Sequence, residues 1–122
     1  MTQEAAIFGF LSGFGIPAYA ATAVPSDVEF PYITYSPVIS GWNQGEATMV
    51  VNVWYRTESE AEPNAKVREI GEVIGIGGVT IPCDDGILWL KRGLPWAQSL
   101  SDESDSKVKR RYLNVDMEYL VI

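Results

Sequence analysis

Every second side chain along Ala47–Arg56 is apolar, and this period of two leaves little freedom in how the stretch can fold. One set of alternate positions is apolar throughout: Ala47, Met49, Val51, Val53 and Tyr55. A period of two predicts a β-strand with one face in a hydrophobic core. The opposite face is mixed, because Val50 and Trp54 stand there among polar residues. We therefore expect part of that second face to be covered, and a neighbouring subunit is one candidate for the cover.

β-rich composition predicts further strands, each bounded by turn residues. They lie at residues 17–24, 30–36, 79–82, 87–90 and 108–122. We expect 30–36 to pair antiparallel with Ala47–Arg56, because a segment rich in Gly, Asn and Gln returns the chain between them. Asp85-Gly86 suits the positive φ of a tight hairpin turn between the strands at 79–82 and 87–90.

Two stretches predict helices, and one predicts a loop. A first helix begins at a Thr2 cap and runs to about Gly13. Its apolar positions at helical spacing are Ile7, Phe8, Leu11 and Phe14. A second helix begins near Pro63, and its apolar stripe is Val67, Ile70, Val73 and Ile74. Residues 92–106 contain Gly and Pro and then many Ser, Asp and Glu, so we expect an exposed, mobile loop there.

The length of 122 residues fits one domain, residues 1–122, with a hydrophobic core. A net charge of −7 argues against binding nucleic acid through overall charge. The chain has no histidine, which excludes His-based catalysis and His-ligated zinc within one chain. Cys83 is the single cysteine, so a disulfide or Cys-x-x-Cys metal site cannot form within one chain. We expect no cofactor and no bound metal, although a carboxylate- or lysine-based enzyme stays open.

The N-terminal region has two interpretations, since residues 5–24 contain no charge and Ala18-Tyr19-Ala20 resembles a signal-peptidase site. One interpretation is a secreted domain that begins after Ala20. Against it, the first four residues carry Glu4 and no Lys or Arg, whereas a signal peptide needs a basic start. Glycines and Pro17 also interrupt the apolar run, which argues against a membrane-spanning helix.

Charged residues near the C-terminus form two adjoining groups. The acidic group consists of Asp102, Glu103 and Asp105, and the basic cluster consists of Lys107, Lys109, Arg110 and Arg111. The acidic group could chelate a cation, but it lacks the glycine and the terminal Glu of an EF-hand, so a solvated loop is the simpler interpretation. The basic cluster could meet an acidic surface on a neighbouring copy, or DNA that passes nearby. Its alternative is a solvated entrance to the last strand.

Other candidate residues have a plain structural explanation beside the functional one. Asp84 and Asp85 could form an acid–base pair, but adjacent residues at a strand end point to opposite sides and a hairpin turn accounts for them. Their charges would raise the pKa of the Cys83 thiol, so we expect no nucleophile there. Trp42 and Trp96 lie in loop-like segments and would suit an interface.

Several segments together resemble the small tail terminator, or tail completion, proteins of long-tailed phages and prophages. The segments are 30–35 (FPYITY), 46–56, the hairpin around 85–89 (DGILW), 93–98 (GLPWAQ) and 108–112 (VKRRY). In order and spacing they cover about three-quarters of the chain. The resemblance implies an α+β fold, a mixed and mostly antiparallel sheet with two helices packed on one face.

The resemblance also implies a structural, non-enzymatic role in the virion tail, with assembly in the host cytoplasm. Proteins of this family form a ring, typically of six copies, that caps the tail tube and receives the filled head. The implied partners are further copies of this chain, the tail tube protein and a head-completion or connector protein, with DNA only passing through the ring and no membrane. The predicted interface residues are Trp96, Asp102, Glu103, Asp105, Lys107, Lys109, Arg110 and Arg111. The alternative function is a small ligand-binding or carboxylate-based enzymatic domain that uses Asp84, Asp85 or Glu118.

Overall fold

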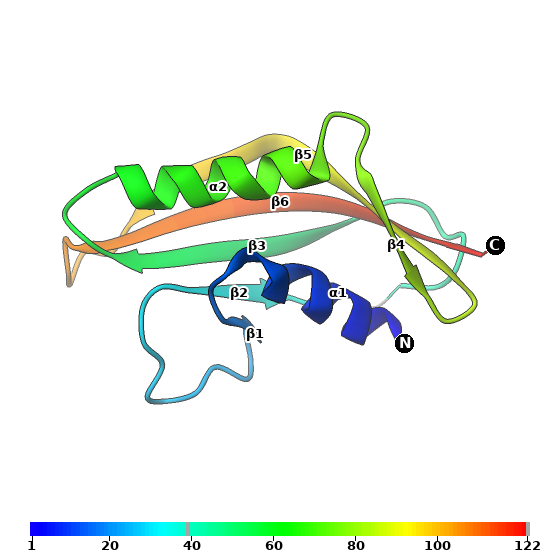
Figure 1. Ribbon diagram of the computed structural model, residues 1–122, viewed down its shortest axis with the longest axis horizontal. Helices are drawn as coiled ribbons and strands as arrows, with labels where there is room; N and C mark the ends of the chain where they lie inside the picture. Colours follow the sequence, from blue (N-terminus) through cyan, green and yellow to red (C-terminus); the bar gives the residue numbers. More distant parts are fainter. Residues whose placement is uncertain (39, 122) are drawn as a thin grey trace.

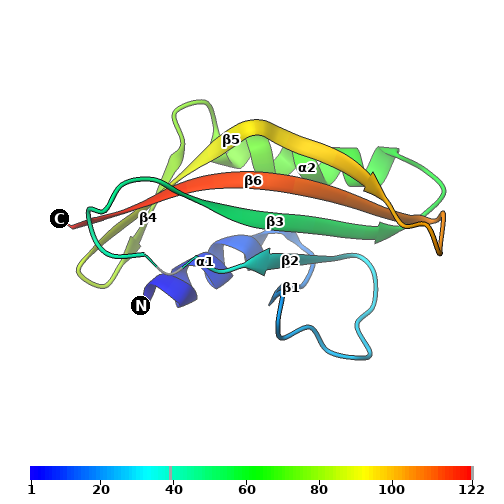
Figure 2. The ribbon, with the colours of Figure 1, turned by 180° about the vertical axis from the view of Figure 1, so that it is seen from behind.

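A computed structural model describes residues 1–38 and 40–121. These residues form two α-helices, one 3-10 turn and one six-stranded sheet. Their bounds are α1 Gln3–Leu11, η1 Ser12–Phe14, β1 Ala18–Ala20, β2 Tyr32–Ser36, β3 Ala47–Arg56, α2 Ala61–Ile74, β4 Val79–Cys83, β5 Gly86–Ser101 and β6 Val108–Val121. Both helices lie on one face of the sheet (Figure 1), and the view from behind looks onto the other face (Figure 2). The predicted α+β class is confirmed.

The sheet has the strand order β1-β2-β3-β6-β5-β4. Only β1 and β2 pair in parallel, whereas all the other neighbours are antiparallel, so the predicted mixed, mostly antiparallel sheet is confirmed. β3 has the predicted bounds, and β6 pairs with it along its whole length, from Ala47 opposite Met117 to Arg56 opposite Val108. These two long strands form the centre of the sheet. The last residue of the predicted final strand, Ile122, lies outside the described residues.

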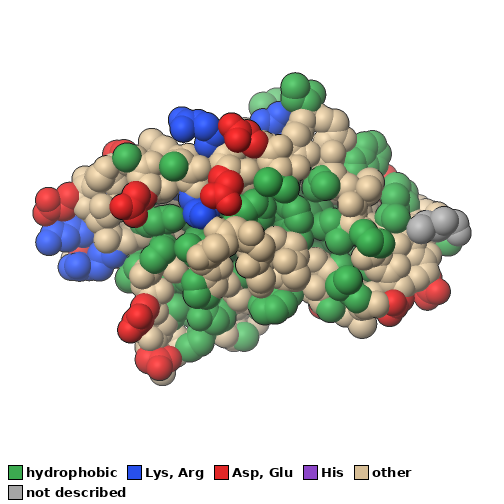
Figure 3. Space-filling model, in the orientation of Figure 1, with side chains coloured by type: hydrophobic (Ala, Val, Ile, Leu, Met, Phe, Trp, Pro, Cys, Tyr) green, Lys and Arg blue, Asp and Glu red, His purple; other side chains and the backbone are tan. Residues whose placement is uncertain are grey.

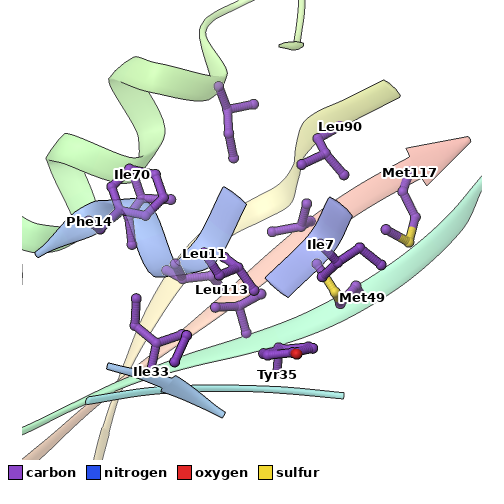
Figure 4. Packing of buried hydrophobic residues seen from close by; sticks show 14 of the residues in the cluster. Ile7, Leu11, Phe14, Ile33, Tyr35, Met49, Ile70, Leu90, Leu113 and Met117 are labelled. Atoms are coloured by element: carbon purple, nitrogen blue, oxygen red, sulfur yellow. The ribbon is translucent and has the colours of Figure 1, made fainter. Parts of the chain in front are cut away.

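The hydrophobic core lies between the two helices and the sheet (Figure 4). β3 contributes its predicted apolar face, and Met49, Val51 and Val53 have no exposed surface. Ile7 and Leu11 of α1 and Ile70 and Ile74 of α2 pack onto this face, together with the alternate apolar residues of β6. The N-terminal apolar stretch is therefore part of the core, and within the described chain no helix is both long and apolar enough to cross a membrane.

The two predicted helices are present, but each predicted apolar stripe is one residue too wide. Phe8 in α1 is 49% exposed, and Val73 in α2 is 50% exposed. Each helix turns only a narrow arc towards the sheet, and consecutive residues lie about 100° apart around a helix. Phe8 follows the buried Ile7, and Val73 precedes the buried Ile74, so both fall outside the arc.

The predicted loop at residues 92–106 is wrong over most of its length, because β5 continues to Ser101. The register between β5 and β6 shifts between Arg92 and Ala97, and regular pairing then resumes. The Nδ2 of Asn114 donates to the backbone oxygen of Pro95 (2.8 Å) and so ties the irregular segment to β6. Residues 98–101 look like a loop in the sequence because they lie exposed at the end of a long strand. Only residues 102–107 connect β5 to β6.

Candidate interaction surface on the open face of the sheet

The face of the sheet opposite the helices, here the open face, carries the side chains that alternate with the core residues. Among the described residues no helix lies against it, as the view from behind shows (Figure 2). Two different groups of side chains occupy this face. One is aromatic with a single arginine, and the other consists of paired charges.

The first group forms a row of contacts that we call the aromatic–arginine ladder. It consists of Tyr19, Phe30, Tyr32, Trp54, Arg110 and Tyr112. The rings of Tyr32 and Trp54 stack with centroids 6.0 Å apart. The guanidinium carbon of Arg110 lies 5.1 Å from the Trp54 ring centroid and 5.9 Å from that of Tyr112. Ring stacking thus joins β2 to β3, and cation–π contacts join β3 to β6 across the sheet.

Polar residues beneath the ladder hold it in place. Thr34 and Asn52 are buried under the aromatic rings although they point away from the core. Trp54 Nε1 donates to Thr34 Oγ1 (2.9 Å), and Arg110 Nε donates to Asn52 Oδ1 (2.8 Å). Because buried polar groups are satisfied and the large side chains are tied to them, the ladder is pre-organised. Aromatic residues and Arg in such an arrangement are typical of the centres of protein–protein interfaces.

The second group on the open face is a network of charges around Lys91. Its Nζ lies 2.8 Å from Glu46 Oε2 and 3.1 Å from Glu118 Oε1, and it also lies 4.2 Å from the centroid of the Trp89 ring. The hydrogen bond with Lys91 lowers the pKa of Glu46, and the hydrogen bonds with Glu46 and Glu118 raise the pKa of Lys91. Lys91 is thus paired with two carboxylates of its own chain.

The predicted basic cluster does not form one surface. Arg110 and Arg111 are adjacent in β6, so their side chains point to opposite faces of the sheet. Arg110 joins the ladder, whereas Arg111 is 3% exposed on the helix side. Arg111 Nε donates to Asn64 Oδ1 (3.1 Å), and its guanidinium also forms an ion pair with Glu60 at the start of α2. Arg111 therefore anchors α2 to the sheet.

The other charged residues that were predicted to lie at an interface are at the end of the molecule where the chain turns from β5 into β6 (Figure 3). Arg56 Nε lies 3.0 Å from Asp105 Oδ2, and Lys107 Nζ lies 3.7 Å from Glu58 Oε1. Lys109 Nζ donates to the backbone oxygen of Ser106 (2.7 Å). A hydrogen bond from the backbone amide of Lys107 lowers the pKa of Asp105, and the hydrogen bond from Arg56 adds a smaller effect in the same direction. This end is an exposed patch of mixed charge.

Asp102 and Glu103 belong to the same patch. Asp102 Oδ1 accepts hydrogen bonds from the amide and the hydroxyl of Ser104, and these bonds lower the pKa of Asp102. Glu103 is exposed. Across the described part of the chain, the acidic residues and Cys83 bring no three ligands together in a group that could hold a metal ion.

The two tryptophans predicted in loops pack within their own chain. Trp42 lies edge-on to Tyr119 with ring centroids 6.1 Å apart. Trp96 is half-buried beside α2, where a Cβ at Gly71 would lie 3.1 Å from its Nε1, so the glycine permits this close approach. Trp96 also lines a groove of about 530 Å³ between α2 and β5, whose other walls include Asn64, Val67, Arg68 and Arg92.

The carboxylates considered for an enzymatic role lie elsewhere. Asp84 forms an ion pair with the N-terminal amine, and Glu118 pairs with Lys91. Asp84, Asp85 and Glu118 all lie outside the lining of the groove. Burial, followed by the charge of Asp84, raises the pKa of Cys83, as the sequence predicts.

Most of the ladder was not predicted from the sequence. Trp54 was expected on the mixed face of a strand, but no contact with Tyr32 or Tyr112 was predicted. The available signal was that large aromatic residues occur at the non-core positions of four predicted strands. The register brings them together, because Tyr32 lies opposite Trp54, and Trp54 lies opposite Arg110.

Comparison with known proteins gives one likeness in three dimensions. No protein-family model matches the sequence, and no curated protein matches it. A chain of a solved structure described as "Virion of native gene transfer agent (GTA) particle" has a similar fold, with a TM-score of 0.68 and 18% sequence identity. The match covers 95% of this chain and 92% of that chain. A similar fold thus also occurs in a chain of a virion particle.

Proposed function

We propose that this chain is a structural protein of a phage-like virion, and that it caps the tail tube as a ring and forms the surface to which the head attaches. The observation that carries the proposal is the likeness of fold, over 95% of the chain, to a chain of a gene transfer agent virion. The segments that resemble tail terminator proteins support the same role. In this proposal the chain is not an enzyme, its partners are other virion proteins, and a ring of six copies is the expected form.

The open face supports an assembly role on physical grounds. Its ladder contains large aromatic side chains and an arginine that are only partly buried in the isolated chain. Such residues contribute most to binding when a partner removes them from water. The patch of mixed charge at the β5–β6 end can select a partner and its orientation, because exposed charges act mainly on specificity and association rate.

The proposed contacts with other virion proteins divide accordingly. Arg110 acts as part of the ladder, and the residues of the charged end, Asp102, Glu103, Asp105, Lys107 and Lys109, act as a second contact. Trp96 and Arg111 contribute indirectly, because both hold α2 in place on the other side of the sheet.

Deletion of the gene from the phage or prophage that carries it tests this function. Electron microscopy would measure tail length and the attachment of heads in the resulting lysate. Overlong tails without heads are the expected result for a protein that ends tail growth. Tails of normal length beside unattached full heads would restrict the role to head–tail joining, and normal infectious particles would refute the proposal. A plasmid copy of the intact gene, which should restore normal particles, is the control.

A further inference from the structure

The second half of β5 presents a free strand edge. β4 pairs only with Gly86 to Leu90, whereas residues 97–101 pair with β6 on one side. On the other side of residues 97–101, no strand of the described chain pairs with them. Its outward-pointing backbone groups are therefore available to another strand.

This edge lacks the usual protection against pairing. Exposed edge strands of soluble proteins generally carry charges or prolines that discourage association. Residues 97–101 carry neither, and Leu100 is 38% exposed. Leu94, in the irregular segment just before, is 98% exposed. The β4 edge differs, since Pro82 lies within that strand and Asp84 directly follows it.

β1 forms the opposite edge of the sheet, as a short strand that Pro17 directly precedes. Its three residues, Ala18–Ala20, carry no charge, and it pairs with β2 alone. Figure 2 shows β1 and β5 at the two sides of the sheet. A sheet with two free edges can grow by adding copies of itself.

The pairing register places the two free edges on the same row of the sheet. One row runs from Tyr19 through Thr34, Asn52 and Tyr112 to Gln98. β1 also runs antiparallel to β5, as the strand directions show when they are followed across the sheet. A neighbouring copy in the same orientation would therefore bring its β1 alongside residues 97–101 as an antiparallel partner, without a shift along the strands.

We propose that β1 of one copy pairs with residues 97–101 of β5 in the next copy, so that one sheet continues from subunit to subunit. This inference rests on the ring proposed above and specifies how its subunits join. The contact uses two different surfaces, which is the head-to-tail geometry that generates a ring when the rotation between copies closes. It also continues the open face across the junction, because Tyr19 and Gln98 lie on that face.

The groove between α2 and β5 fits this junction. Residues 96–99 of β5 line it, so a strand added at this edge would lie beside the groove. The helix-side residues of β1 are Ala18 and Ala20, which are in register with the core residues Ile33 and Tyr35. Both side chains are small, so they would take up little space beside Trp96 and Val67 of the neighbouring copy.

Disulfide crosslinking tests the pairing. The test variant carries Tyr19→Cys and Gln98→Cys together with Cys83→Ser, so that only the introduced cysteines can react. Directly opposed antiparallel residues lie about 4.5–5.5 Å apart at Cα, which suits a disulfide. A second variant, Tyr19→Cys with Leu100→Cys, covers a register two residues away on the same face. The control pairs Tyr19→Cys with Thr80→Cys on the β4 edge. All variants are oxidised both as purified full-length protein and in particles, and are then separated on a non-reducing gel.

We expect a series of crosslinked multimers from either test variant. The control should give only the uncrosslinked chain. Multimers from the control alone would overturn the inference. A chain that assembles, by sedimentation or by its presence in particles, without a crosslink in either test variant would also overturn it. If the unaltered chain assembles neither alone nor in particles, the junction and the ring are both refuted.

Gene deletion separates this inference from the proposed function. Overlong tails after deletion, combined with no crosslink in the test variants, would keep the terminator role and remove the strand pairing. Normal particles after deletion, combined with a crosslinked ladder, would keep the pairing as a mode of self-association and remove the virion role.

Discussion

The two faces of the sheet differ in which side chains they bury. The covered face is apolar, and its central residues Met49, Val51 and Val53 have no exposed surface. The open face buries polar residues such as Thr34 and Asn52 under aromatic side chains that stay partly exposed. The covered face thus stabilises the fold by removing apolar surface from water, whereas the open face keeps a fixed surface available for a partner.

Arg110 and Arg111 show the contrast within two adjacent residues. Both are arginines of β6, yet one stacks on Trp54 at the surface and the other ties α2 to the sheet from a buried position. A charge cluster in a strand is therefore two half-clusters on two faces. Its members need separate tests.

The largest expected loss of stability comes from truncating a core residue of β3, compared with the same truncation of its neighbour on the open face. Met49→Ala should lower the free energy of unfolding by about 2–5 kcal/mol, because it leaves a cavity in the core. Val50→Ala, the matched change on the open face, should cost clearly less, because Val50 is only half-buried. Urea unfolding followed by circular dichroism measures both. Equal midpoints for the two variants would show that the covered face is not the principal core.

The next test replaces the two arginines one at a time, beginning with Arg111. Arg111→Met should lower the free energy of unfolding by about 1.5–3 kcal/mol, since it removes hydrogen bonds of a charged, buried group to Asn64 and Glu60. Complementation of the gene deletion at a temperature where this variant is folded should still yield normal particles. Failure there would give Arg111 a direct role in assembly.

Arg110→Glu should behave in the opposite way. The Asn52 amide can rotate and donate to the new carboxylate, so thermal unfolding should change little. Complementation should fail, because the ladder would carry a negative charge where it now carries a positive one. Normal tails with attached heads from this variant would exclude Arg110 from the contact. Arg110→Lys, which keeps the charge, is the matched control.

The smallest effect concerns the paired charges of the open face. Lys91→Met should lower the melting temperature at neutral pH by about 1–4 °C, the range for a partly exposed ion pair. The pKa of Glu46 is lowered from 4.5, so its contribution to stability is present above that pH and is lost as pH falls. The pKa of Lys91 is raised from 10.5, so its contribution is present below that pH and is lost as pH rises further.

Thermal unfolding of the parent and of Lys91→Met across this range measures the linkage. The difference in melting temperature between them should be largest between about pH 5 and pH 10 and should shrink towards pH 3. A difference that does not depend on pH would assign the effect to packing of the Lys91 side chain on Trp89 instead.

What the amino-acid sequence by itself determined is the local character of most elements. The alternation along Ala47–Arg56 is a local property of the chain, and it predicted both the strand and its buried face correctly. The helix beginning near Pro63 and the hairpin at Asp85-Gly86 were likewise set by residues that act on their own backbone. These features need no knowledge of distant contacts.

What only the tertiary structure decided depends on which strands lie side by side. Residues 97–101 show no alternation of buried and exposed side chains and look like a loop, and they form a strand because β6 offers a continuous partner beyond the irregular segment. The ladder exists because the register sets Tyr32, Trp54 and Arg110 side by side from three strands. Strand order and register are non-local, since they are chosen by the burial of the whole sheet rather than by any one segment. For that reason the chemistry of the open face became visible only in the folded chain.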